Sequence, residues 1–293
     1  MQGAAQRILT FDSHYASLHS SRFRWDGETL DIIGLPERTH PYLEWEDRGL
    51  ALTIGGLLKA IALATAKHER RAQEMLFPDA NDRQVYAGIA FLPLTSGMDA
   101  AHVEFLVQRC TNRRQYEQEP LEAVTVEELL SSVSQYRCRI RIVTDAEQKE
   151  QLGAAATAFL RLMLENKERH AVLFGNVAWS EVEERHRKEG LALPSMEFNP
   201  MQRLLFRRAR NWQTIRVLNK LGFSRLVAAT EAKLSAASAA TAIISVTDTS
   251  RESFIEAGKA MMTLWLAGIL ARPEHGSRHR HTLRPPAHHR RLD

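Results

Sequence analysis

The sequence predicts an α+β protein that contains two related halves. Three observations lead to this class. An Asp-Gly pair separates two strand-like runs near the start, long apolar helical segments stand at residues 50–70 and 251–271, and a strand-to-helix pattern occurs twice after residue 140. Strands grouped beside separate helices, without regular alternation, are typical of α+β folds.

The first third of the chain is predicted to form strands packed on one helix. Asp26 and Gly27 favour the positive φ values of a tight turn, so residues 22–25 and 28–33 should form a hairpin. The helix at residues 50–70 is apolar on most sides and should be buried. Two more strands, separated by a turn at residues 78–82, are predicted at residues 72–77 and 84–94.

The rest of the chain is predicted to be mainly helical. Thr125 should cap a helix at residues 126–135, and Asp145 should cap a helix that runs to Glu165, because their side chains can accept from the first unpaired amides. The other predicted elements are a helix at 100–109, strands at 139–144 and 239–246, a largely helical region at 179–235 broken at 190–194 and at Gly222, and the helix at 251–271.

A weak internal repeat relates two strand-to-helix joints. Residues 142–145 read Ile-Val-Thr-Asp and residues 245–248 read Ser-Val-Thr-Asp, and each is followed by a helix with an early glycine, Gly153 or Gly258. In both joints the aspartate is expected to cap the helix. A duplicated half-domain would leave such a pattern, and chance similarity between two joints is the alternative.

Composition indicates an ordinary globular protein. Of the 293 residues, 44% are hydrophobic and 25% are charged, which suffices for a real core. The two cysteines, Cys110 and Cys138, form neither a disulfide framework nor a metal-ligand spacing. Residues 1–19 carry charges where a secretory signal needs an apolar stretch, and Lys59 makes residues 49–66 a buried helix rather than a membrane span. We therefore expect a cytoplasmic protein with no metal site and no membrane partner.

The net charge of +4 is concentrated at the end of the chain. Residues 274–293 contain five arginines against two acids, which leaves the remainder nearly neutral. Because this excess lies in a Pro- and His-containing tail and not on a patterned face, no nucleic-acid partner is expected. The composition of the tail predicts disorder, and a changed reading frame is one explanation for it.

A basic cluster follows the predicted helix at residues 100–109. Residues 109–116 read Arg-Cys-Thr-Asn-Arg-Arg-Gln-Tyr, which places three guanidinium groups and a hydroxyl within six residues. Guanidinium forks and hydroxyl groups are suitable donors to a phosphate. Chemistry alone leaves two readings open, a phosphate site and a solvated basic turn, because no glycine-rich loop accompanies the cluster.

The chain resembles the FMN-dependent nitroreductase superfamily, and in particular its double-length, Acg-like branch. The similarity rests on the basic cluster, which resembles the family's R-R-[ST]-x-R element, on a tryptophan followed by a Gly-Leu-Ala-Leu segment, and on a late helix. These stretches lie at residues 109–120, 179–193 and 256–267. The resemblance covers residues 22 to about 273 and implies a nitroreductase-like fold, with a mostly antiparallel sheet between helical layers.

The resemblance also implies which side chains hold the cofactor. Arg109, Thr111 and Arg113 match positions that contact FMN in the family, and Asn112 offers one more donor. Cys110 stands where a second arginine is usual, which removes one phosphate contact.

Two further cofactor-binding candidates, Arg22 and Gly258, come from the other matching stretches. Packing is the alternative role for Gly258 and for Trp265. Members of the branch usually carry an Asn-x-Gln-Pro-Trp-Arg-Phe segment near the first strand, whereas here only Arg22 and Phe23 of that pattern remain. The amide side chains that would approach the flavin are therefore missing.

The implied activity is that of an oxidoreductase in which NAD(P)H reduces FMN and the flavin reduces a small nitroaromatic or quinone-type acceptor. Because the flavin supplies the redox chemistry, no residue is assigned a catalytic role. Two alternatives stay open. One is a non-catalytic protein that binds or sequesters flavin, and the other is a helical scaffold whose arginines bind an acidic partner.

The predicted domain organisation follows from the repeat and the resemblance. Nitroreductase-like halves are expected at residues 1–98 and 99–273, and a disordered tail at 274–293. A doubled chain can supply both halves of a cofactor cleft, so a monomer with internal pseudo-symmetry is expected, with a homodimer as the alternative.

Overall fold

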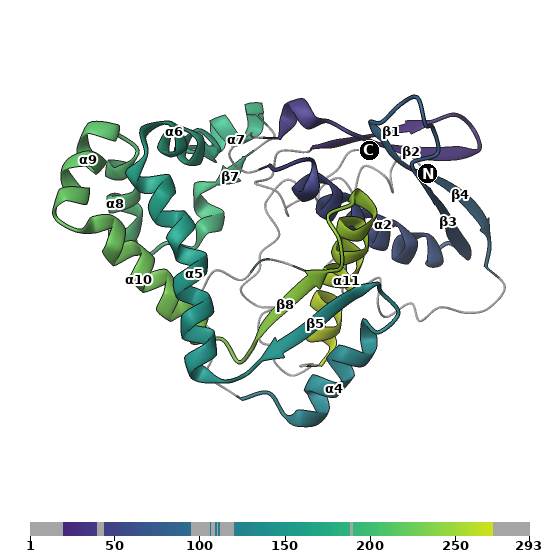
Figure 1. Ribbon diagram of the computed structural model, residues 1–293. Coiled ribbons are helices and arrows are strands. Elements are labelled where there is room, and N and C mark those ends of the chain that lie inside the picture. Colours follow the sequence, from purple (N-terminus) through teal and green to yellow (C-terminus); the bar gives the residue numbers. More distant parts are fainter. Residues whose placement is uncertain are drawn as a thin grey trace.

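Two antiparallel sheets and a short parallel strand pair, surrounded by helices, make up the fold (Figure 1). The computed structural model describes residues 20–39, 44–94, 106, 109, 111, 120–187 and 190–271, and these residues form nine α-helices. The predicted α+β class, with mostly antiparallel pairing, is confirmed. The helix predicted at residues 100–109 lies outside the described residues, apart from Leu106 and Arg109.

The larger sheet contains four strands in the order β1-β2-β4-β3. The predicted first hairpin is confirmed, since the Asp26 carboxylate accepts hydrogen bonds from the amides of Glu28 and Thr29, and Gly27 has a φ of +110°. An aspartate and a left-handed glycine together close the turn between the first two strands. The strands are β1 (Ser21–Trp25), β2 (Thr29–Gly34), β3 (Arg70–Leu76) and β4 (Val85–Pro93), and the short 3-10 helix Pro36–Arg38 follows β2.

Helix α2 (Arg48–Ala66) packs against this sheet and contributes eleven buried residues. Its first turn is held by the Glu44 carboxylate, which accepts from the amides of Gly49 and Leu50 at 2.9 Å each. The helix was predicted to reach residue 70. It ends earlier because Glu69 adopts a left-handed φ of 55° and Arg70 enters β3.

Helix α11 (Arg251–Leu270) crosses α2 at very short range. A Cβ atom on Gly55 would overlap the carbonyl oxygen of Ile255, and a Cβ atom on Gly258 would overlap the carbonyl oxygen of Leu52. The two backbones can approach this closely only because neither glycine has a side chain. Residues of α11 thereby join the core formed by α2 and the four-stranded sheet.

The smaller sheet pairs β5 (Cys138–Val143) with β8 (Thr241–Val246), and α4 (Ala123–Ser132) and α11 contact it. Both strands were predicted. The predicted cap of α4 is wrong, because the helix begins at Ala123 after Glu122 and no side chain caps it. Thr125 therefore lies inside the first turn, past the position where its hydroxyl could cap the helix.

Two strand-to-helix joints follow these strands, as predicted, but their caps differ. Asp145 caps α5 (Ala146–Glu165) by accepting from the amide of Gln148 at 2.9 Å. The predicted cap Asp248 is wrong, because Ser250 caps α11 by accepting from the amide of Ser253. Asp248 instead accepts from the hydroxyl and amide of Ser250 and from the hydroxyl of Ser253, and these bonds lower its pKa to about 2.

The early glycines of the two joints hold equivalent positions. Gly153 and Gly258 each stand eight residues after the cap of their helix. A Cβ atom on Gly153 would lie 2.8 Å from the carbonyl oxygen of Ala232 in α10 (Phe223–Ala236). Gly258 faces the backbone of α2 in the same way. Each glycine therefore marks a close helix crossing. Duplication of a half-domain, and the boundary at residue 98, stay predictions.

Between α5 and β8 the chain is helical, and we call residues 200–236, which form three helices, the helical arm. The predicted breaks at residues 190–194 and at Gly222 are confirmed, and asparagine caps at Asn166, Asn199 and Asn211 divide the region further. The elements are α6 (Lys167–Gly175), β6 (Val177–Ala178), α7 (Glu181–Arg187), β7 (Leu191–Ala192), the 3-10 helix Leu193–Met196, α8 (Pro200–Ala209), α9 (Trp212–Lys220) and α10 (Phe223–Ala236).

Two helices, α2 and α11, are long and apolar enough to cross a membrane by length and composition alone. In α2, 61% of the most apolar window is buried inside the protein, which confirms the predicted core helix. A second core lies among α5, α6, α8 and α9, at the opposite end of the molecule from the four-stranded sheet (Figure 1). The β5–β8 pair lies between the two ends.

Candidate functional site

Arg109 lies buried against Trp265 of α11. Arg109 is only 7% exposed, and its guanidinium carbon lies 4.3 Å from the centre of the Trp265 indole ring. A guanidinium group over an indole face at this distance makes a cation–π contact. The fold therefore brings together two of the three stretches on which the expected nitroreductase resemblance rests.

Helix α11 fixes the position of Trp265. Met262 and Leu266, on neighbouring positions of the helix, are each 2% exposed and belong to the main core. Because these side chains anchor the last turns of α11, the partly buried ring of Trp265 presents a rigid surface to Arg109. The contact therefore joins the basic cluster to the best-packed part of the molecule.

Of the basic cluster, the structure describes only Arg109 and Thr111. Thr111, two residues after Arg109, is exposed. Asn112 and Arg113, the other predicted FMN contacts in the cluster, lie outside the described residues, as does Cys110.

Two buried hydroxyl groups stand at the start of β1. Ser20 and Ser21 are 1% and 5% exposed, and among the described residues the Oγ atom of neither has a hydrogen-bond partner. A buried hydroxyl without a partner costs about 1–3 kcal/mol. The two serines belong to the segment that, by the expected resemblance to nitroreductases, would present amide side chains to the flavin. The sequence indicated that the amide side chains are missing, but it did not indicate these serines. Two polar residues in a row give no sign that their side chains are buried.

The remaining two predicted cofactor residues lie in different surroundings. Arg22 follows Ser21 on β1 and is exposed. Gly258 faces the backbone of α2, which fills the space that a side chain would occupy. Helix packing therefore accounts for the glycine at this position.

The matching stretch at residues 179–193 packs in another place, beside the helical arm. The Trp179 ring stacks at 5.5 Å on Phe206 of α8, and its Nε1 donates to the carbonyl oxygen of Phe174 at 3.3 Å. Trp179 also contacts the apolar cluster that contains Leu193. Gly190 has a φ of +90°, and a Cβ atom there would lie 2.5 Å from a backbone carbonyl oxygen. These contacts make the stretch a packing element.

A partly buried ion cluster between α11 and β3 contains residues that sequence reasoning missed. The Nζ atom of Lys259 lies 2.6 Å from the Glu74 carboxylate of β3 and 3.2 Å from Glu256. Burial opposes the charged form of Lys259, but the hydrogen bond and charge of Glu74, with help from Glu256, raise its pKa. Only the Glu256–Lys259 spacing on one helix was visible in the sequence, and nothing there pointed to Glu74.

Cys138 lies near this cluster at the start of β5. Burial, and then the negative charge of Glu256, raise the pKa of its thiol. A thiol with a raised pKa is a poor nucleophile at neutral pH. Cys138 is therefore not suited to covalent chemistry. The ion cluster itself links β3 to α11 through the Glu74–Lys259 ion pair.

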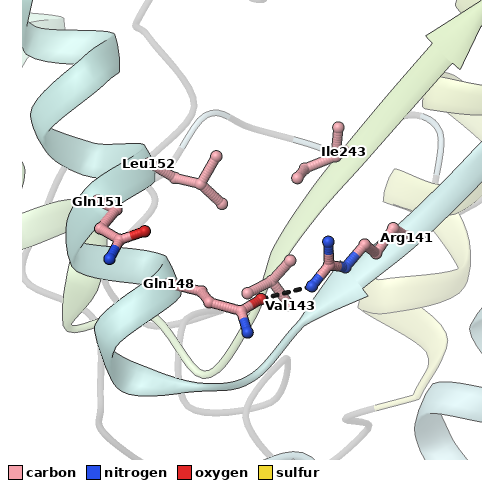
Figure 2. Close-up of a pocket in the computed structure, with 6 residues that line it drawn as sticks. All are labelled: Arg141, Val143, Gln148, Gln151, Leu152 and Ile243. Atoms are coloured by element: carbon pink, nitrogen blue, oxygen red, sulfur yellow. Dashed lines mark hydrogen bonds between the residues drawn. The ribbon is translucent and has the colours of Figure 1, made fainter.

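An open pocket of about 450 Å³ lies between the β5–β8 pair and α5 (Figure 2). Figure 2 shows three apolar and three polar side chains facing it, with a hydrogen bond from the Arg141 guanidinium to the Gln148 side chain. The volume is within the range of small-ligand sites. Of the predicted cofactor residues that the structure describes, Arg22, Arg109, Thr111 and Gly258, none lines this pocket. The lining residues are Arg141, Val143, Gln148, Gln151, Leu152 and Ile243.

The described donors lie in two places. The Arg109 guanidinium lies against Trp265, near the end of α11, whereas Ser21 pairs with Gly34 beside Tyr86, the ring that lies under Arg251 at the start of α11. A guanidinium group is suited to a phosphate, and hydroxyl groups are suited to a polyhydroxyl chain. Within the described ranges, no group of three or more His, Cys, Asp or Glu side chains could hold a metal ion. In comparisons with known proteins, no protein-family model matches the chain and no curated protein matches it.

Proposed function

We propose that this protein binds FMN and transfers electrons from NAD(P)H, through the flavin, to a nitroaromatic or quinone-type acceptor. The contact between Arg109 and Trp265 carries the proposal. It supports the family resemblance because residues far apart in the sequence, taken from two of the matching stretches, meet at one place. A solvated basic turn would not require a buried guanidinium fixed on an indole ring.

The donor chemistry fits FMN. A guanidinium group binds phosphate oxygens through paired, charge-assisted hydrogen bonds, and hydroxyl groups can bond ribityl or ring atoms. When bound, FMN supplies the hydride and electron transfer. In the proposed site, Arg109 and Arg113 bind the phosphate end, Thr111 donates a hydroxyl, and Ser20 and Ser21 are additional polar partners.

The colour and the visible spectrum of the purified protein provide the first test. A flavoprotein is yellow, and apoprotein titrated with FMN should regain the absorption. Protein that stays colourless and fails to bind added FMN would contradict the proposal. Arg113→Ala should weaken FMN binding by more than a factor of ten, because one charge-assisted phosphate contact is worth about 1.5–3 kcal/mol. The matched control, Arg141→Ala, removes an exposed arginine at the pocket between α5 and the β5–β8 pair and should leave the affinity unchanged.

Ser21→Ala gives a sharper test of the second donor group. In the ligand-free protein the substitution removes an unpaired buried hydroxyl, so the free energy of unfolding should rise by about 1 kcal/mol. If the hydroxyl bonds to FMN, the same substitution should weaken FMN binding several-fold. A rise in stability with unchanged FMN affinity would remove Ser21 from the site.

The loss of the amide-bearing segment before β1 favours a second candidate, a flavin-binding protein with little turnover. Anaerobic mixing with NADPH distinguishes the two. Rapid bleaching of bound flavin is expected for the oxidoreductase, because hydride transfer needs access to the ring. Bound flavin that stays oxidised would favour storage or sequestration.

A further inference from the structure

The helical arm carries most of the positive charge of the protein. Residues 200–236 contain eight arginines and lysines and a single acid, Glu231, for a net charge of +7. The tail at residues 274–293 carries +3, so the remaining chain carries −6. The near neutrality expected for the chain outside the tail is therefore a cancellation between a basic arm and an acidic remainder.

All eight cations of the arm are exposed and available to a partner. Among the described residues, none of them forms an ion pair with a carboxylate. Arg225 is close enough to Glu165 to help lower the pKa of that carboxyl, whose main hydrogen bond comes from Ser224. Arg210 lies over the ring of Trp179 at 4.8 Å. The cations are Arg203, Arg207, Arg208, Arg210, Arg216, Lys220, Arg225 and Lys233.

Large aliphatic side chains are exposed among these cations. On α8, Met201, Leu204 and Leu205 share one helical face with Arg208, because the four residues follow the i, i+3, i+4, i+7 spacing. The three aliphatic side chains are 63%, 52% and 41% exposed. On the side that α8 turns to the core lie the partly buried Phe206 and the buried Ala209, and Leu205 lies next to Ala209, one turn before it.

Helix α9 repeats this arrangement. Ile215 is fully buried, and Arg216, Val217 and Lys220 lie on the opposite, exposed side. Leu221, at the end of the helix, is 81% exposed, and Leu226 at the start of α10 is 66% exposed. The arm thus presents aliphatic and cationic side chains together, at the end of the molecule remote from the four-stranded sheet (Figure 1).

We propose that the helical arm is a docking surface for anionic phospholipid membranes. Helices that mix lysine and arginine with exposed leucine and methionine lie in the membrane interface, where cations meet lipid phosphates and aliphatic groups enter the acyl boundary. The exposed aliphatic residues favour a membrane over a nucleic acid, because phosphate contacts to nucleic acids leave such side chains in water. The arm would hold the protein flat against an anionic membrane surface without crossing it.

Co-sedimentation of the full-length protein with vesicles tests this surface. Binding to vesicles that mix phosphatidylcholine with phosphatidylserine is expected, with much weaker binding to phosphatidylcholine alone. The double variant Arg207→Glu, Arg208→Glu should bind the mixed vesicles about tenfold less tightly or worse. Its matched control, Arg139→Glu with Arg141→Glu, makes the same charge change at exposed arginines of β5 and should bind nearly as the wild type does.

A second pair of variants tests the aliphatic part of the surface. Leu204→Ser with Leu221→Ser should also weaken vesicle binding, whereas Met75→Ser with Val182→Ser, which changes equally exposed residues elsewhere, should not. Absence of binding to the mixed vesicles would overturn the proposal. The proposal would also be overturned if the arm variant and the β5 variant lost vesicle affinity equally. That result would show that binding depends on the net charge of the protein and on its basic tail. Tighter binding to duplex DNA, unaffected by the leucine substitutions, would identify a nucleic-acid surface instead.

Discussion

Single glycines decide how closely the helices pack. At Gly258 the α2 backbone occupies the place of a side chain, and carbonyl oxygens cannot move aside as a flexible side chain can. Gly258→Ala should therefore force α2 and α11 apart and lower the free energy of unfolding by at least about 2 kcal/mol. Urea unfolding followed by circular dichroism measures this loss.

Gly268 on the same helix provides the matched control. Nothing lies within 4 Å of the position that its Cβ atom would take, and the residue is exposed. Alanine is the better helix former, so Gly268→Ala should raise stability by up to about 1 kcal/mol. If both alanine variants unfold at the same urea concentration, the close crossing of α2 and α11 does not require a glycine at position 258.

At the scale of elements, His170 ties α6 to the end of α8. Its Nε2 atom lies 2.8 Å from the carbonyl oxygen of Ala209, the last residue of α8, which has no partner within its own helix. The ring is 3% exposed and packs against Phe174 and Trp212. The acceptor carbonyl assigns the proton to Nε2 in the neutral ring.

Burial makes this tie sensitive to pH. Desolvation lowers the pKa of His170 below its ordinary 6.5, and the hydrogen bond to Ala209 offsets only part of that effect. The unfolded chain then binds a proton more readily than the folded one, so stability is complete above pH 6.5 and falls as the pH drops toward the folded-state pKa. The expected slope from this group is up to about 1.4 kcal/mol per pH unit.

Urea unfolding at a series of pH values checks this prediction. In His170→Gln the slope below pH 6.5 should become smaller, although the variant is less stable throughout. His186→Gln changes an exposed histidine of α7 and should keep the wild-type slope. An unchanged slope in His170→Gln would show that other groups cause the acid sensitivity.

The elements themselves were predictable where their signals are local. The Asp26–Gly27 turn and the Asp145 cap depend on neighbouring residues alone, and both were predicted. Prediction failed where equivalent residues compete, since Ser250 rather than Asp248 caps α11. It also failed for contacts between distant segments. Nothing in the sequence pairs Lys259 with Glu74, because only the tertiary fold brings these residues of α11 and β3 together.

The candidate site shows the same division. The basic cluster was visible in the residue types, but the contact of Arg109 with Trp265 depends on the tertiary fold. The charge of the helical arm was present in the sequence and was missed, because summing over the chain outside the tail cancelled it against distant acids. Charge counted over single elements would have separated the arm from the acidic remainder.

At the scale of the whole molecule, the two ends are packed very differently. Helix α2 contributes eight buried residues to a core shared with the four-stranded sheet and α11. In the arm, α8 buries only Ala209 and α9 only Ile215. Because local stability follows buried apolar contact, the arm should open without unfolding of the main core.

Hydrogen exchange measured by mass spectrometry tests this difference. Amides of α8 and α9 should exchange well before those of α2 and β4. Ile215 is fully buried, so Ile215→Ala should cost about 2–5 kcal/mol and speed exchange throughout the arm while leaving α2 protected. Ile61→Ala, in α2, should instead speed exchange in α2 and β4. If Ile215→Ala accelerates exchange in α2 as much as in α8, the protein unfolds as one unit, and an arm that opens by itself is contradicted.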